Sequence, residues 1–304
     1  MRLCPDGGHV DDDLADHQRQ LEGRGIYDER NRLNDLTGRE WKFATKSVIH
    51  EAYPPALQHD LRSEHGGQKP PRLCMDLIER FSKAEETVLD PFAGVGGTLL
   101  GASLCAHEGT GLRSAIGFER TGRWVELYEE VLEQENAERD GRGDPPLAPQ
   151  TLHHGDCAEL IERIPDHSID LLLTDVPFWS MDKLEHTRNE DRTRSSKLGS
   201  FDEDPPGTKV DWLEDMGRKF DRFVEAVRTD GHVLVFIGDM YREQSYEFLS
   251  ADLARAIETT VPDVRLIANL IWYDPSKELH VYGYPYAFVP SMVHQNILVF
   301  RVDR

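Results

Sequence analysis

The chain of 304 residues lacks long hydrophobic runs, and no stretch approaches the roughly 20 apolar residues that a membrane-spanning helix needs. Its polar, acidic N-terminus shows no secretion signal. Only 4 cysteines are present, without a C-x-x-C pair or a Cys/His cluster at zinc-like spacing. We therefore expect a reduced, cytoplasmic protein that has no membrane association and binds no metal.

Positive charge is also scarce, because 35 Lys and Arg residues stand against 56 Asp and Glu residues, a formal net charge of -21. Nucleic-acid-binding proteins usually carry basic surfaces, since neutralising phosphates supplies much of their affinity. Two explanations stay open. One is a high-salt cytoplasm, in which acidic self-repulsion is screened within about 3 Å near 1 M salt. The other is a basic partner that supplies the contacts to nucleic acid.

The N-terminal region has little apolar patterning. Residues 1–32 are rich in Asp, Arg, Gly and Gln, which predicts a disordered acidic tail. Thr37 and Glu40 then have the spacing of a capping box, and the apolar residues from Trp41 to Val48 predict one face of a helix. We expect order to begin at residue 33 and to continue to the end of the chain as a single domain.

From residue 72 onward, helical patterns alternate with short apolar runs. The predicted strands cover residues 86–92, 114–119, 151–156, 168–175, 231–239, 265–273 and 295–302. The predicted helices cover residues 72–83, 98–106, 122–139, 157–164, 212–228 and 250–258. This alternation predicts an α/β fold with a parallel sheet covered by helices on both faces. Residues 180–209 are charged and irregular, an insertion of the kind that is usually functional or mobile.

A glycine-rich turn follows the first of these strands. In "VLDPFAGVGGTLLGA", residues 88–102, a strand ends at Asp90 and leads through Gly94, Gly96 and Gly97 into a helix. Glycine lets the backbone approach a ligand closely at the carboxyl end of a strand, where open α/β sheets bind nucleotides. The stretch is neither a P-loop nor G-x-G-x-x-G. Tight packing alone would explain the glycines, but it would not require the preceding Asp-Pro-Phe.

A second buried strand ends in an unusual way, in "DLLLTDVPFW". An ordinary turn is one interpretation, and a pocket for a flat, amine-bearing ring is the other. Asp175 and the backbone carbonyl of Val176 can accept the two hydrogens of an exocyclic amine. Donating both hydrogens would localise the lone pair on the nitrogen and make the amine a better nucleophile. Pro177 stiffens the turn, and Phe178 offers a ring face on which a base can stack.

These segments resemble the S-adenosylmethionine-dependent DNA amino-methyltransferases, which modify adenine N6 or cytosine N4. "DPFAGVGGT" is similar to their cofactor loop, "HGGQKPPRLCMDLIERF" to the segment at the methionine end of the cofactor, and "TDVPFW" to their Asp/Asn/Ser-Pro-Pro-aromatic catalytic motif. The resemblance covers roughly residues 65–180, and it departs at Val176, where proline is usual. It implies a Rossmann-like, doubly wound sheet of about seven strands, mostly parallel with an antiparallel final strand.

The resemblance also implies S-adenosyl-L-methionine as the cofactor. Glu119 is suited to accept the ribose hydroxyls. Asp156 is suited to accept the adenine amino group, although a helix N-cap is an equal interpretation. Lys69 can meet the cofactor's carboxylate or, as an exposed lysine, do nothing. The candidate cofactor-binding residues are Lys69, Pro70, Asp90, Pro91, Phe92, Ala93, Gly94, Gly96, Thr98, Glu119 and Asp156.

The function implied is methyl transfer to the exocyclic amine of a flipped base in DNA, within a restriction, defence or genome-marking system. An aspartate at the first position of the motif favours adenine over cytosine. Two alternatives stay open: an RNA amino-methyltransferase, and a non-catalytic subunit that binds S-adenosylmethionine within a larger assembly.

No sizeable target-recognition domain is expected after the last predicted strand. The insertion at 180–209 and the aromatic loop at 274–294 are the candidates for target contacts, with packing or a solvated surface as equal interpretations. Trp179 can add a second stacking face or belong to the core. The candidate substrate-binding residues are Trp179, Arg188, Arg192, Arg194 and Lys197. A partner subunit or a homodimer that supplies DNA contacts follows as a hypothesis from the acidic charge.

Overall fold

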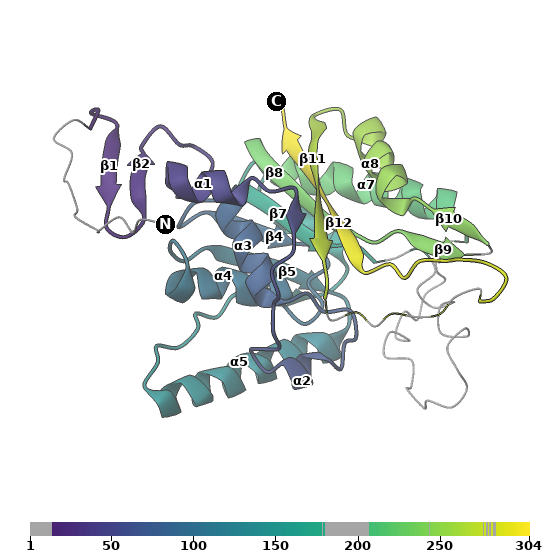
Figure 1. Ribbon diagram of the computed structural model, residues 1–304, viewed down its shortest axis with the longest axis horizontal. Coiled ribbons are helices and arrows are strands. Elements are labelled where there is room, and N and C mark those ends of the chain that lie inside the picture. The colour runs from purple at the N-terminus through teal and green to yellow at the C-terminus, as the bar shows by residue number, and fades with distance from the viewer. Residues whose placement is uncertain are drawn as a thin grey trace, which may run out of the picture.

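The computed structural model describes residues 14–177, 179, 207–242, 244–275, 277, 279, 281 and 284–304, and Figure 1 shows how its elements are arranged. The strands are β1 (Gln18–Leu21), β2 (Gly25–Asp28), β3 (Val48–Ile49), β4 (Thr87–Asp90), β5 (Ser114–Glu119), β6 (Thr151–His154), β7 (Ile169–Asp175), β8 (Val227–Ile237), β9 (Met240–Arg242), β10 (Ser245–Glu247), β11 (Val264–Tyr273) and β12 (His294–Val302). The helices are α1 (Gly38–Ala44), α2 (His59–Arg62), α3 (Pro71–Phe81), α4 (Gly97–Glu108), α5 (Gly122–Arg142), α6 (Cys157–Leu160), the 3-10 turn η1 (Ile161–Arg163), α7 (Lys209–Ala226) and α8 (Leu249–Thr260).

The central sheet has 8 strands in the order β3-β11-β12-β8-β7-β4-β5-β6. The neighbouring strands from β8 to β6 are all parallel, whereas the final strand, β12, is antiparallel to both β8 and β11. The predicted α/β fold, with its mostly parallel sheet and antiparallel last strand, is therefore confirmed. The sheet exceeds the expected seven strands because Val48 and Ile49 add the short strand β3, parallel to β11.

Helices cover both faces of this sheet. Residues of α6, α7 and α8 pack on one face around Phe220, and residues of α3, α4 and α5 pack on the other around Leu77. Strand β7 contributes to both clusters, because Leu172 faces the first while Leu171 and Leu173 face the second. A strand that is buried on both faces needs apolar residues at consecutive positions, which explains the unbroken leucine run. Among the helices of the described part, none is both long and apolar enough to cross a bilayer.

Three acidic residues stand at the carboxyl ends of adjacent strands. Strand β4 ends at Asp90, β5 at Glu119 and β7 at Asp175. Because β4 pairs with β5 on one side and with β7 on the other, the three ends lie at the same edge of the sheet. The chain passes from β4 to β5 in one direction and later returns to β7 in the other. This reversal of strand order is where open α/β sheets bind ligands.

The N-terminal region differs from the expected disordered tail in the part that the structure describes. Strands β1 and β2 form an antiparallel hairpin, and Tyr27 within it is buried. Lys83 Nζ donates a hydrogen bond to Tyr27 Oη at 3.2 Å, which attaches the hairpin to the segment before β4. Order therefore begins well before residue 33, whereas residues 1–13 lie outside the described residues.

The capping box predicted for the first helix is confirmed. Thr37 Oγ1 accepts the Glu40 N–H at 3.3 Å, and Glu40 Oε2 accepts the Thr37 N–H at 2.8 Å. The predicted length is wrong, since α1 ends at Ala44 and Val48 begins strand β3. The expected apolar face is not buried either, because the side chains of α1 all retain solvent contact and Trp41 is 39% exposed.

Candidate functional site

The glycine loop joins β4 to α4 and depends on glycine at two positions. Gly94 and Gly96 have φ values of +53° and +76°, a left-handed conformation that is costly for other residues. A Cβ atom on Gly96 would lie 2.3 Å from Tyr128 Cδ2, and one on Gly94 would lie 3.1 Å from His65 Nε2. The loop therefore requires glycine both for its backbone conformation and for its close packing.

Glu119 fixes the position of this loop. Its Oε2 atom accepts the Gly94 N–H at 2.9 Å, and its Oε1 atom accepts the Thr121 N–H at 2.7 Å. Burial raises the pKa of Glu119, while the hydrogen bonds from Thr121 and Gly94 oppose that shift. Each carboxylate oxygen can accept a further hydrogen bond. The acid is thus placed beside the glycine loop with acceptor capacity for the hydroxyls of a nucleoside.

Asp90 connects the ends of β4 and β7. Its Oδ1 atom accepts hydrogen bonds from Thr174 Oγ1 at 2.7 Å and from the Phe92 N–H at 3.1 Å. Burial raises the pKa of Asp90 to about 6, and the bonds from Thr174, Thr98 and Phe92 counteract part of this shift. Asp90 is only 4% exposed, so it organises the loop from within.

Asp175 lies at the end of β7 and pairs with Lys69. Lys69 Nζ donates to Asp175 Oδ2, and the two side chains are 9% and 24% exposed. The other carboxylate oxygen, Oδ1, is shielded from solvent and has no hydrogen-bond partner among the described residues. Burial raises the pKa of Asp175, whereas the Lys69 ammonium and the charge of Lys277 lower it. Among the described residues, one carboxylate oxygen of Asp175 therefore accepts a hydrogen bond and the other does not.

The glycine loop and Asp175 lie close together because Lys69 contacts both. The backbone oxygen of Lys69 is 3.0 Å from the position that a Cβ of Gly97 would take, and its ammonium reaches Asp175. Lys69 immediately precedes Pro70, which is the N-cap of α3. The three sequence segments of the methyltransferase resemblance are therefore brought into one place.

The turn after β7 is anchored to the core. The Val176 side chain is buried, and the Pro177 carbonyl accepts the Trp212 Nε1–H at 3.0 Å. Trp179 packs against the same hydrophobic cluster, which supports the core interpretation of this residue. The remaining predicted substrate-side residues lie outside the described residues: Phe178, Arg188, Arg192, Arg194 and Lys197.

Further candidate cofactor residues make contacts within the protein itself. The Ala93 N–H donates to the Phe118 carbonyl at 2.9 Å, and the Phe92 ring meets Phe223 edge-on at 5.8 Å. Pro91 lies between Asp90 and Phe92 in this turn. Asp156 caps α6, because its Oδ1 atom accepts the Ala158 N–H at 2.7 Å. The helix N-cap interpretation of Asp156 is thus observed, and a contact with the cofactor stays a prediction.

Two polar residues at the site were missed in the sequence. His65 Nδ1 accepts the Gly67 N–H at 3.3 Å, and burial lowers the pKa of His65 to about 4. The neutral ring therefore carries its hydrogen on Nε2, the atom that faces Gly94. Gln68 Oε1 is buried without a hydrogen-bond partner among the described residues. Both residues belong to the "HGGQKP" segment, and the resemblance of that segment to the methyltransferases could have pointed to them.

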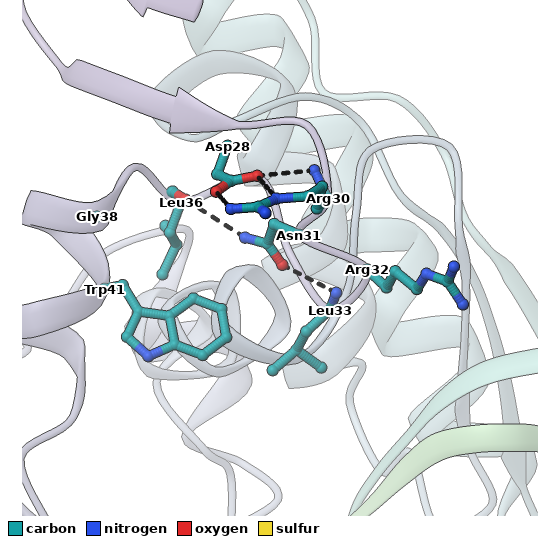
Figure 2. A pocket seen from close by; sticks show the side chains of 8 residues that line it. All are labelled: Asp28, Arg30, Asn31, Arg32, Leu33, Leu36, Gly38 and Trp41. Carbon is teal, nitrogen blue, oxygen red and sulfur yellow. Dashed lines mark hydrogen bonds and ion pairs between the residues drawn. The ribbon is translucent and has the colours of Figure 1, made fainter. Parts of the chain in front are cut away.

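A separate hollow of about 450 Å³ lies between the β1–β2 hairpin and α1. Figure 2 shows Trp41 and Leu36 on its wall, with Arg30 held by Asp28. This hollow is near the amino end of β4, since Lys83 just before that strand contacts the hairpin. It is therefore distinct from the site at the carboxyl ends of the strands.

A comparison with known families agrees with the sequence motifs. Residues 15–130 match the family model described as DNA methylase, the N6/N4 methyltransferases. This match covers less than half of the chain, and it supports the resemblance to the adenine-N6 and cytosine-N4 DNA methyltransferases. The matched segment includes the glycine loop, Glu119 and Lys69, and it ends before β7 and Asp175.

The comparisons with curated proteins and with solved structures identify nothing more specific than the family model does. No curated protein matches the chain. TrmN from Thermus thermophilus is 14% identical with a TM-score of 0.44, and the match covers 79% of this chain and 52% of that one. A S-adenosylmethionine-dependent methyltransferase from Methanosarcina mazei is 9% identical with a TM-score of 0.45, covering 75% of this chain and 97% of that one. The chain thus spans about half the length of TrmN.

The cofactor of this family is S-adenosyl-L-methionine, and the residues present fit that molecule. Glu119 offers acceptors for the ribose, and the buried Gln68 Oε1 is an acceptor without a partner in the described part of the chain. His65 Nε2 supplies a donor beside Gly94. The glycine loop provides a narrow backbone turn at the end of β4. The edge of the sheet thus offers acceptors and a donor that suit polar groups of the cofactor.

Proposed function

We propose that this protein transfers a methyl group from S-adenosyl-L-methionine to the exocyclic amine of a base in DNA, with adenine N6 favoured over cytosine N4. The arrangement of Asp175 carries the proposal. One of its oxygens is held by Lys69, and the other is a buried acceptor without a partner in the described part of the chain, next to the glycine loop. A buried acceptor of this kind requires a donor, and an NH2 group supplies one.

The proposed chemistry follows from the poor nucleophilicity of a base amine, whose lone pair is delocalised into the ring. Asp175 Oδ1 accepts one amine hydrogen, and the Val176 carbonyl accepts the other. The lone pair is then localised on the nitrogen and directed at the methyl group. Holding the two reactants in this geometry supplies much of the rate. Val176 replaces the usual proline, but its buried side chain still fixes the peptide that carries the carbonyl.

The target base has to leave the duplex to reach Asp175, at a cost of a few kcal/mol. Phe178 is the proposed stacking partner in the pocket. Pro177, held through its carbonyl by Trp212, keeps the turn in place while the base enters. A rigid turn is useful here, because misplacement of the amine by about 1 Å would weaken both hydrogen bonds.

The proposed contacts with DNA come from two segments. One is the insertion that contains Arg188, Arg192, Arg194 and Lys197. The other is the loop after β11, where Tyr284, Tyr286 and Phe288 are 80%, 95% and 94% exposed. Exposed aromatic rings can stack on unpaired bases without phosphate contacts, which suits an acidic protein. A partner subunit or a second copy of the chain would supply the missing positive charge. We place the protein in the cytoplasm, in a restriction, defence or genome-marking system.

The test is to incubate the protein with methyl-labelled S-adenosylmethionine and either double-stranded DNA or total RNA, then to digest and separate the nucleosides. Label in N6-methyladenine from DNA supports the proposal, and label in N4-methylcytosine corrects only the base. Label in RNA alone would replace the substrate. Cofactor binding without transfer to either polymer would instead indicate a non-catalytic subunit.

A further inference from the structure

The Lys69 ammonium beside Asp175 is largely enclosed by the protein. Lys69 is 9% exposed, its ammonium contacts Asp175 Oδ2, and its Nζ atom lies 5.3 Å from the centre of the Phe236 ring. Phe236 is the β8 register partner of Asp175, so the aromatic face and the carboxylate bound the same small space. Burying an ammonium is costly unless a carboxylate compensates it. The Lys69 ammonium therefore forms its ion pair with Asp175 in this structure.

The backbone of Lys69 is fixed independently of the ion pair. The Arg62 Nη1–H donates to the Lys69 carbonyl at 3.4 Å, and the same guanidinium donates to the Leu57 and Ala56 carbonyls at 2.8 and 2.9 Å. On the other side, Gly97 approaches the Lys69 carbonyl so closely that a Cβ would be 3.0 Å away. The ammonium is thus delivered to Asp175 by a rigid segment.

We propose that Lys69 is a positioning residue for methyl transfer: by holding Oδ2 of Asp175 it keeps that carboxylate ionised and leaves Oδ1 as the single acceptor for the base amine. This inference rests on the proposed function. It gives Lys69 a different role from the cofactor-carboxylate contact that the sequence suggested. A lysine that neutralised the cofactor would have to leave Asp175, and the buried carboxylate would then lose its compensating charge.

The charges around Asp175 make the role of Lys69 testable. Asp90 on β4 is a second buried acid nearby, and the charge of Asp175 contributes to raising the pKa of Asp90. Lys277, after β11, lowers the pKa of Asp175, as Lys69 does. An opposite charge in direct contact shifts a carboxyl pKa by roughly 1–3 units, so removing Lys69 raises the pKa of Asp175. The ionised form would then be lost at a higher pH.

The step balances with Lys69 unchanged. The amine nitrogen forms a bond to the methyl carbon as the carbon–sulfur bond breaks, and that electron pair stays on sulfur. The methylated nitrogen is then cationic, and it passes one proton to Asp175 Oδ1, from which the proton leaves to solvent. Lys69 remains an ammonium throughout, and it stabilises the carboxylate before and after the transfer.

The experiment compares Lys69→Met and Lys69→Arg with the wild type. Lys219→Met is the matched control, because Lys219 Nζ pairs with Asp215 Oδ2 at 2.6 Å and both side chains, on α7, are partly buried. Single-turnover transfer to DNA is measured from pH 5 to 9 at saturating cofactor, and cofactor affinity is measured by calorimetry. We expect Lys69→Met to lower the rate about 100-fold at pH 7. The acidic limb of its pH–rate profile should move to higher pH by about one pH unit or more.

The affinity for the cofactor should change by no more than about threefold in Lys69→Met. Lys69→Arg should recover part of the rate, because it restores the charge, and Lys219→Met should behave as the wild type. A rise in the cofactor dissociation constant of about tenfold or more, with an unchanged saturated rate and pH limb, would overturn the proposal and return Lys69 to the cofactor. Lys69→Gln, which keeps a neutral donor, serves if Lys69→Met fails to fold.

A readout without turnover separates this inference from the proposed function. The carboxyl carbon of Asp175 is titrated by ¹³C NMR in the wild type and in the neutral variant of Lys69, with Asp175→Asn to assign the signal. A higher pKa in the variant supports the role of Lys69, and an unchanged pKa overturns it. If the wild type methylates neither DNA nor RNA, the proposed function fails, while the titration still decides the ion pair.

Discussion

Replacing Gly96 by alanine tests whether the glycine loop is as tightly constrained as its geometry indicates. Gly96 has φ +76°, and an added Cβ would lie 2.3 Å from Tyr128 Cδ2 and 2.8 Å from Cε2. Tyr128 is 2% exposed, and its hydroxyl accepts the Gln150 N–H at 3.3 Å, so the ring cannot turn away freely. The methyl group therefore has to displace either the ring or the loop.

Two costs combine in this substitution. A left-handed conformation costs a non-glycine residue roughly 1–2 kcal/mol. Forcing an extra methyl group into a packed interior costs roughly 1–3 kcal/mol more. We expect Gly96→Ala to lower the free energy of unfolding by about 2–5 kcal/mol, a large part of the roughly 5–15 kcal/mol available to a domain.

Gly143→Ala separates the two costs. Gly143 ends α5 with the same φ of +76°, and a Cβ there would meet nothing within 4 Å. We expect this control to lose only the backbone contribution, about 1–2 kcal/mol. Urea unfolding of both variants and the wild type gives the two values. Equal losses at the two positions would refute the packing argument, because Gly96→Ala would then carry no steric cost.

Three further substitutions test the supports of the site. Trp212→Phe removes the donor to the Pro177 carbonyl and should lower the free energy of unfolding by about 1–2 kcal/mol, measured in urea. Arg62→Met leaves three carbonyls, including that of Lys69, without this donor, and should cost about 2 kcal/mol or more in the same assay. Burial raises the pKa of Asp90 from 3.8 to about 6 in the folded protein. Because the unfolded chain loses this proton at a lower pH, the free energy of unfolding of the wild type should fall as the pH rises from about 4 to about 6. Asp90→Asn should remove about 3 kcal/mol of that decline when unfolding curves are compared across pH.

Each of these has a contradicting outcome. An unchanged unfolding midpoint in the Trp212 variant would mean that the indole hydrogen bond does not hold the turn. Full stability in the Arg62 variant would show that water or another donor replaces the guanidinium. Parallel pH curves for the wild type and the Asp90 variant would mean that this carboxyl titrates as it does in the unfolded chain.

The order of strands and helices could be predicted from the sequence because each element is locally patterned. The leucine run before Asp175 and the apolar positions of α3 are decided by burial alone. The acids at the strand ends could also be predicted, since the carboxyl edge of a parallel sheet gathers whatever follows each strand. Local pattern failed for β3, a strand of two residues whose existence depends on pairing with β11.

Long-range contacts could not be predicted in the same way. Lys69 and Asp175 are 106 residues apart, and no spacing rule relates them. The hydrogen bond from Trp212 to Pro177 joins an ordinary amphipathic helix to the turn that it supports. The β1–β2 hairpin resembles a polar tail in sequence, because its strands are four residues long and mostly polar. Such features arise from tertiary packing that no short window contains.

The most direct measurement of the central claim compares methyl transfer and cofactor affinity in Asp175→Ala. If the free Oδ1 atom draws the base amine towards the methyl donor, transfer to DNA at saturating cofactor should fall at least about 100-fold. The cofactor dissociation constant from calorimetry should stay within about threefold of the wild-type value. Transfer at the wild-type rate, or a loss of cofactor binding as large as the loss of transfer in a folded variant, would contradict the account.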